Sequence, residues 1–125
     1  MLINISNHPS ANWSDAQKQS AIEQYGEIMD IPFPHFDPEW KHDQVSDAVT
    51  EMFLHLQRMW ETGKIDRSKL TMHIMGEMTY CHDLVERFHR SNVLCVASTT
   101  KRQVLEEKDG KKTLLFDFVR FRRYY

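Results

Sequence analysis

The feature that most constrains the fold is an alternation of short apolar runs with segments of helical character. The runs have the length and composition of buried strands and span residues 2–5, 27–31, 70–75 and 92–97. The helical segments span residues 14–25, 42–62 and 79–90. Because short connections join strands and helices in turn, we expect a mostly parallel sheet with helices on both faces.

The C-terminal quarter changes pattern. Asp109-Gly110 lies between two strand-like runs, residues 103–107 and 113–122, which is a strong signal for an antiparallel hairpin. A chain of 125 residues fits one domain. We therefore predict a single Rossmann-like, three-layer α/β domain over residues 1–125, closed by a C-terminal antiparallel β-hairpin.

Composition and charge argue against several classes of function. The chain is 41% hydrophobic and 27% charged, and its net charge of -2 argues against bulk binding of nucleic acid. No stretch resembles a signal peptide or a membrane span, and Cys81 and Cys95 form no C-x-x-C motif. We expect a reduced, cytoplasmic protein; a secreted one would require these two cysteines to come within bonding distance.

Residues suited to a ligand follow each of the four apolar runs. They form the tails 6–10, 32–34, 76–79 and 98–102. In a parallel sheet of order 2-1-3-4, such tails meet at the carboxyl edge, and the strand order reverses between the first and third strands. This edge is the candidate site.

The residue types at this edge suit a phosphate ester. Gly76 permits close approach of a ligand, and Thr79 is the expected cap of a helix whose free amides favour an anion. Lys101 and Arg102 suit phosphate oxygens, and His8 is the best placed titrating group. The common glycine-rich nucleotide motifs and the G-x-S-x-G motif are absent.

Structural roles remain open for several of these residues. The hydroxyls of residues 98–100 could have a purely structural role, bonding the local backbone. Glu77 could likewise do no more than balance a nearby cation. His73 alternates within a strand and is expected to be a core histidine. None of the seven histidines forms an i,i+4 pair, so we expect no metal and no cofactor.

Four short motifs carry a resemblance that covers most of the chain. They are S-N-H-P at residues 6–9, M-G-E-x-T at 75–79, S-T-T-x-R at 98–102 and F-x-F-V-R-F-R-x-Y at 116–124. Together they resemble small CRISPR-associated proteins of the CARF-like, ring-nuclease type.

The resemblance implies a homodimer that binds cyclic oligoadenylate, with cyclic tetra-adenylate the expected ring, and degrades it to switch off type III CRISPR signalling. Cleavage would use a ribose 2′-OH and no metal. The implied catalytic residues are His8, Glu77, Lys101 and Arg102. The implied ligand-binding residues are Ser6, Asn7, Ser10, Gly76, Thr79, Thr99 and Thr100.

Two other hypotheses about the function remain. A non-catalytic dimer that sequesters or senses the ring would carry nearly the same residues. A general RNA- or DNA-binding protein could instead use the arginines and aromatic residues of segment 118–125, although pairing of that edge with a second subunit fits equally well.

Overall fold

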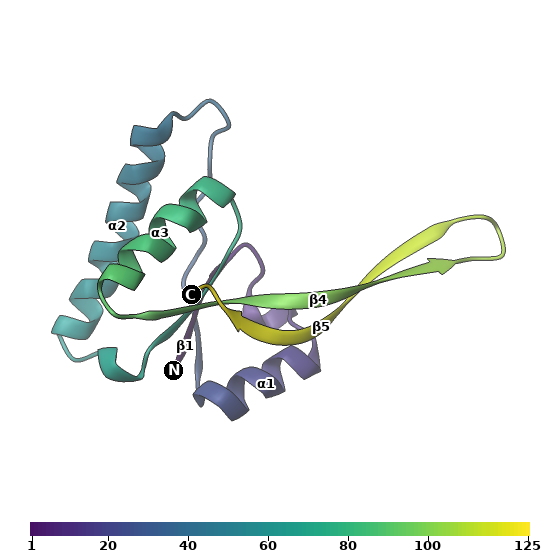
Figure 1. Ribbon diagram of the computed structural model, residues 1–125, viewed down its shortest axis with the longest axis horizontal. Coiled ribbons are helices and arrows are strands. Elements are labelled where there is room, and N and C mark those ends of the chain that lie inside the picture. Colours follow the sequence, from purple (N-terminus) through teal and green to yellow (C-terminus); the bar gives the residue numbers. More distant parts are fainter.

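The computed structural model describes residues 1–125 and arranges five strands in one sheet, in the order β2-β1-β3-β4-β5 (Figure 1). The strands are β1 (Leu2–Ser6), β2 (Ile28–Asp30), β3 (Thr71–Met75), β4 (Leu94–Glu106) and β5 (Lys112–Arg123). The helices are α1 (Asp15–Tyr25), α2 (His42–Glu61) and α3 (Met78–Arg90), with short 3-10 turns η1 (Ser10–Asn12) and η2 (Arg67–Lys69).

The pairing confirms the predicted order. Strand β1 pairs in parallel with both β2 and β3, β3 pairs in parallel with β4, and β5 alone is antiparallel. The order along the sheet reverses between β1 and β3, as expected. The protein is therefore a mixed α/β fold, mostly parallel, with a C-terminal antiparallel pair.

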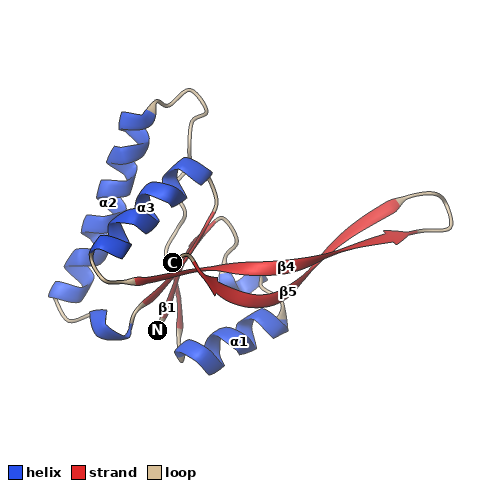
Figure 2. Cartoon of the chain, viewed as in Figure 1, coloured by secondary structure: helices blue, strands red, loops and turns tan.

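Helices cover both faces of the sheet (Figure 2). Helix α1 covers one face over a small core that includes Leu2, Trp13 and Phe121. Helices α2 and α3 cover the other face, where eighteen buried residues form the main core. Because side chains alternate along a strand, one set of residues in β1 and β3 faces α1 and the other faces the main core.

Local signals explain the helix ends. The Ser14 side chain accepts a hydrogen bond from the Gln17 amide at the start of α1, and Gly26 ends this helix with a φ of 87°. Helix α2 buries a stripe at helical spacing, made of Val45, Val49, Met52 and Leu56.

One boundary prediction was wrong. Residues 98–102 are not a polar tail between two strands, because β4 runs without interruption from Leu94 to Glu106. Strand β5 supplies partners along this whole length, from Val96↔Arg123 to Glu106↔Lys112, with an irregularity between Thr99 and Thr100. The β-branched side chains of Thr99 and Thr100 suit a strand. The sheet consequently has five strands rather than six.

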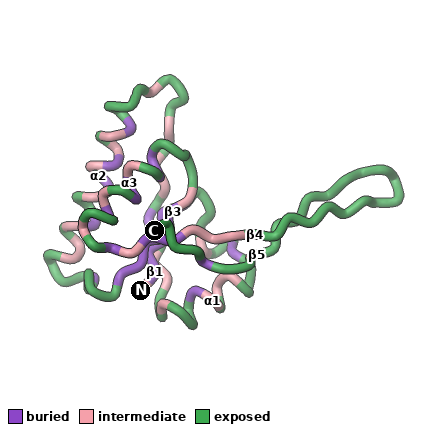
Figure 3. Tube along the Cα trace, viewed as in Figure 1, coloured by how far each residue is buried: buried purple, intermediate pink, exposed green.

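The far end of this hairpin projects from the body as an arm (Figure 1). We define the arm as residues 101–117, all of which are exposed (Figure 3). The hydrophobic side chains of the arm therefore have no helix over them. No helix in the structure has the length and apolar character needed to span a membrane.

Candidate functional site

A pocket of about 420 Å³ opens at the carboxyl ends of β1 and β3, beside the middle of β4, on the face that carries α1. We call it the edge pocket. Its lining combines histidines, hydroxyls and aromatic rings: Ser6, His8, Asn12, Trp13, Ser14, Gln17, His73, Met75, Ser98, Thr100, Phe116 and Phe118. It lies at the reversal point of the strand order, where ligands bind in open α/β sheets.

A polar network underlies the edge pocket. The Asn4 amide nitrogen donates to Asp30 Oδ1 at 2.7 Å and to the His8 carbonyl at 3.0 Å. The Asn4 oxygen accepts from Ser6 Oγ at 2.8 Å. Burial raises the pKa of Asp30, but hydrogen bonds from Ser10 and Asn4 outweigh this effect and lower it. These contacts fix which way the Asn4 amide points.

The orientation of Asn4 sets the protonation of His73. Nδ1 of His73 lies 2.8 Å from Asn4 Oδ1, which has no proton to give, so Nδ1 carries the hydrogen. Nε2 is then the free acceptor and lies 3.2 Å from Ser98 Oγ. The imidazole is only 2% exposed and meets the Trp13 ring edge-on at 5.1 Å.

Burial, followed by the charge of nearby His8, lowers the pKa of His73 to about 4. His73 is therefore neutral at physiological pH, with one unprotonated nitrogen directed at a pocket hydroxyl. A neutral imidazole of this kind can accept a proton but is a weak base.

The depressed pKa predicts a pH dependence of stability. In the unfolded chain His73 should titrate near 6.5, whereas in the folded protein it titrates near 4. Its contribution is thus fully present above pH 6.5 and is lost as the pH falls towards 4, by up to about 3 kcal/mol. Urea unfolding at several pH values measures this loss. The His73→Gln variant should lose less stability over that window, and an equal loss would contradict this account.

The rest of the pocket suits an anionic, aromatic ligand. Ser14 is the N-cap of α1 and Gln17 lies in its first turn, where the helix dipole favours negative charge. Phe116 and Phe118 supply flat apolar surface for stacking, whereas Trp13 is buried against His73 and Phe121.

The structure brings together some of the predicted site residues. Ser6, His8 and Thr100 line the edge pocket. Arg102 pairs with Phe116, so its side chain leaves the hairpin on the face that lines the pocket.

Other predicted residues lie elsewhere. Asn7 is exposed outside the pocket lining, and the Ser10 hydroxyl donates to Asp30. Thr99 uses its hydroxyl on the Arg120 carbonyl, and Lys101 leaves the hairpin on the opposite face from Thr100. Because side chains alternate along β4, Thr99 and Lys101 lie on the opposite face of the strand from Thr100 and Arg102. Residues that were expected to act together are therefore separated.

The turn before α3 has mainly structural contacts. Glu77, and not Thr79 as predicted, is the N-cap: its carboxylate accepts from the Thr79 hydroxyl and from the Thr79 and Tyr80 amides. The Thr79 hydroxyl in particular lowers the pKa of Glu77. A Cβ on Gly76 would lie 2.3 Å from Phe33 Cζ, so the close approach at Gly76 is to a protein ring.

Gly76 and Thr79 line two further hollows beside α3. Gly76, together with Met75 and Tyr124, lines one of about 320 Å³. Met75 also lines the edge pocket, so it stands between the two.

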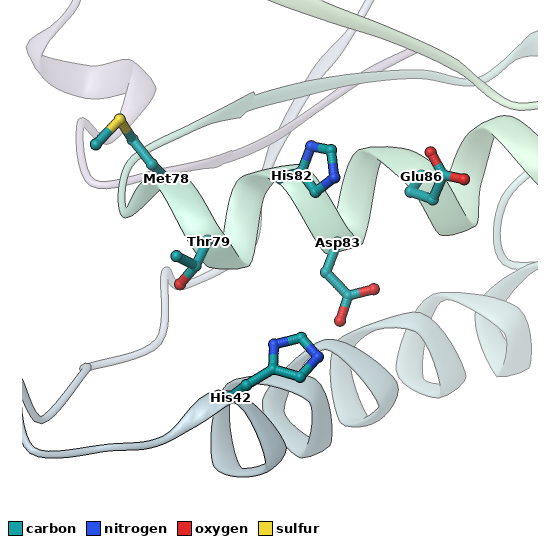
Figure 4. Close-up of a pocket in the computed structure, with 6 residues that line it drawn as sticks. All are labelled: His42, Met78, Thr79, His82, Asp83 and Glu86. Carbon is teal, nitrogen blue, oxygen red and sulfur yellow. The ribbon is translucent and has the colours of Figure 1, made fainter.

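Thr79 lines a hollow of about 460 Å³ between α2 and α3 (Figure 4). His42 and Asp83 point towards each other across it, and Asp83 also contacts Arg87 at 3.6 Å. Across the whole chain, no three His, Cys, Asp or Glu side chains are grouped to hold a metal ion.

Sequence reasoning missed the centre of the site. The buried polar residues of the protein are Asn4, Ser6, Thr71 and His73, and all belong to β1 and β3. They alternate with core residues such as Ile5 and Ile74, so they share the face of the sheet under α1. Polar residues at every second position of two apolar runs were the signal that could have revealed this face.

These features define a mixed α/β protein with a histidine-containing polar pocket at the carboxyl edge of its sheet. The model of the uncharacterized protein MJ1673 family matches residues 1–122, and the chain belongs to this family. No curated protein and no solved structure matches the chain.

Proposed function

We propose that this protein is a CARF-like, Rossmann-like domain that binds a cyclic oligoadenylate in the edge pocket and opens the ring without a metal. The observation that carries the proposal is that two histidines, His8 and neutral His73, line one pocket at the strand-order reversal.

The proposed reaction needs one proton acceptor and one proton donor. A ribose 2′-oxygen forms a bond to the adjoining phosphorus, its proton passes to a base, and the bond from phosphorus to the 5′-oxygen breaks. The leaving oxygen takes a proton from an acid, giving a linear product with a 2′,3′-cyclic phosphate. In-line geometry supplies much of the acceleration, and acid–base help supplies the rest.

We assign the main acid–base role to His8, which is exposed and lines the pocket. His73 assists through Ser98, whose hydroxyl lies within hydrogen-bond distance of the unprotonated Nε2. Glu77 has no part in this scheme, because its carboxylate is engaged at the start of α3.

Ligand binding uses the remaining lining. Adenine bases stack on Phe116 and Phe118, and phosphates lie near the first turn of α1 and near Arg102. Such a protein would act as a homodimer that removes the messenger of type III CRISPR signalling.

Incubation with cyclic tetra-adenylate in the presence of EDTA, followed by chromatography, tests the proposal. We expect linear products that end in a 2′,3′-cyclic phosphate. A ring that stays intact for hours with excess protein would contradict the catalytic assignment.

A second function is favoured by one observation. His73 is almost fully buried and its pKa is about 4, which makes it a poor base. A non-catalytic protein that sequesters or senses the same ring would tolerate such a histidine. Tight calorimetric binding without turnover would distinguish this function from the first.

A further inference from the structure

Strand β4 has a long unpaired edge. Its ladder with β3 covers only Leu94, Cys95 and Val96, and Met75, the last residue of β3, lies against Ser98. Beyond Ser98, β4 continues for eight residues, from Thr99 to Glu106, bonded on one side to β5 and with no strand paired on the other. An open edge of this length can pair with a strand of another chain. Natural proteins usually block such edges unless the pairing is used.

The sequence along this edge is antisymmetric in charge. Residues 101–107 read K-R-Q-V-L-E-E, with two cations before Val104 and two anions after it at equal spacing. None of these four charged side chains forms an ion pair within the chain.

We propose that two copies of the chain associate by antiparallel pairing of these β4 edges, with the two-fold axis at Val104. Lys101 then faces Glu107 of the second copy, and Arg102 faces Glu106. Each pair occurs twice, so four complementary charge pairs form. Opposite charges placed directly across antiparallel strands stabilise the pairing.

The same pattern disfavours other arrangements. Parallel pairing in register would place Lys101 against Lys101 and Glu106 against Glu106. The edge thus specifies both its partner, a second copy, and the direction of that copy.

Exposed apolar side chains add to the surface. The hairpin carries six of the large hydrophobic residues that the fold leaves exposed: Val104, Leu105, Leu114, Leu115, Phe116 and Val119. Val104 would pack on its own symmetry mate, and Leu105 beside Gln103 of the second copy. Exposed apolar residues gathered on one element mark an interaction surface.

This interface is inferred from the free strand edge and its charges rather than from the proposed ligand or reaction, although Arg102 is also assigned to the phosphate contacts. Its centre at Val104 lies four residues beyond Thr100, the last residue of β4 in the lining of the edge pocket. Because the pairing depends on the strand edge and not on a ligand, failure of ligand binding would leave the association intact.

Charge reversal tests the pairing by sedimentation equilibrium. The wild type should sediment at twice the 14.9 kDa of one chain. Lys101→Glu with Arg102→Glu makes all four pairs repulsive and should weaken dimerisation about 100-fold. Glu106→Lys with Glu107→Lys should do the same. Mixing these two double variants should restore a dimer, and so should combining all four changes in one chain.

A matched control is available in the turn of the arm. Lys108→Glu with Lys111→Glu makes the same change in net charge as Lys101→Glu with Arg102→Glu, at exposed positions outside the proposed pairing, and should dimerise like the wild type. A monomeric wild type would overturn the proposal, as would a dimer that both edge variants leave unchanged. Retention of the wild-type circular dichroism spectrum would show that the variants remain folded.

Discussion

Replacing His8 with alanine should slow the opening of cyclic tetra-adenylate by about 100-fold or more. His8 is exposed and lines the edge pocket, and its carbonyl is held by the Asn4 amide and by the Trp13 indole. The backbone position is therefore fixed while the ring is free to meet a ligand. Loss of the imidazole removes proton transfer but leaves the network beneath it unchanged.

Single-turnover kinetics at saturating protein measure this effect separately from binding. His82→Ala is the matched control, because His82 is an exposed histidine of α3 that lines the other hollows and not the edge pocket. The control should cleave at the wild-type rate. Equal rates for the two variants would remove His8 from the mechanism.

Replacing Gly76 with alanine should lower the free energy of unfolding by about 3 kcal/mol. The added Cβ would lie 2.3 Å from Phe33 Cζ, and the φ of +153° is unfavourable for a side chain. The Phe33 ring cannot easily move, because its centroid lies 5.4 Å from that of Tyr80 and 5.6 Å from that of Phe36.

Urea unfolding with Gly63→Ala as a control separates steric overlap from backbone strain. Gly63 also has a positive φ, of +76°, but no atom lies within 4 Å of its added Cβ. This control should lose only about 1 kcal/mol. A similar small loss for Gly76→Ala would show that Phe33 yields at little cost.

The alternation of apolar runs and helical segments was sufficient to predict the sheet. The short connections and the apolar stripe of α2 led to the parallel order, and Asp109-Gly110 marked the hairpin. Strand β4 was divided in error because Ser98 to Arg102 is polar. Pairing with β5 satisfies its backbone, a tertiary contact that residue-by-residue propensity does not register.

The candidate site could be predicted only in part. Placing polar tails at the carboxyl edge correctly brought Ser6 and His8 to one pocket. It did not indicate which face of the sheet each tail would join. Gly76 and Thr79 line hollows beside α3, whereas Ser6 and His8 lie under α1.

His73 shows why the rest was hidden. The sequence correctly indicated a buried histidine in a strand, and its 2% exposure fits a core residue. Its link to Ser98 depends on the register of β3 with β4, and its tautomer depends on Asn4, 69 residues away in the chain. Contacts of this kind arise only when strands are in place.

Calorimetric titration of cyclic tetra-adenylate into two matched variants tests the location and chemistry of the site most directly. Thr100 lines the edge pocket and Thr79 lines the hollow beside α3, and both are exposed threonines. Thr100→Glu places a negative charge against the phosphates and should abolish measurable binding. Thr79→Glu should bind like the wild type. Loss of binding in Thr79→Glu with wild-type affinity in Thr100→Glu would place the ligand beside α3 and contradict the account.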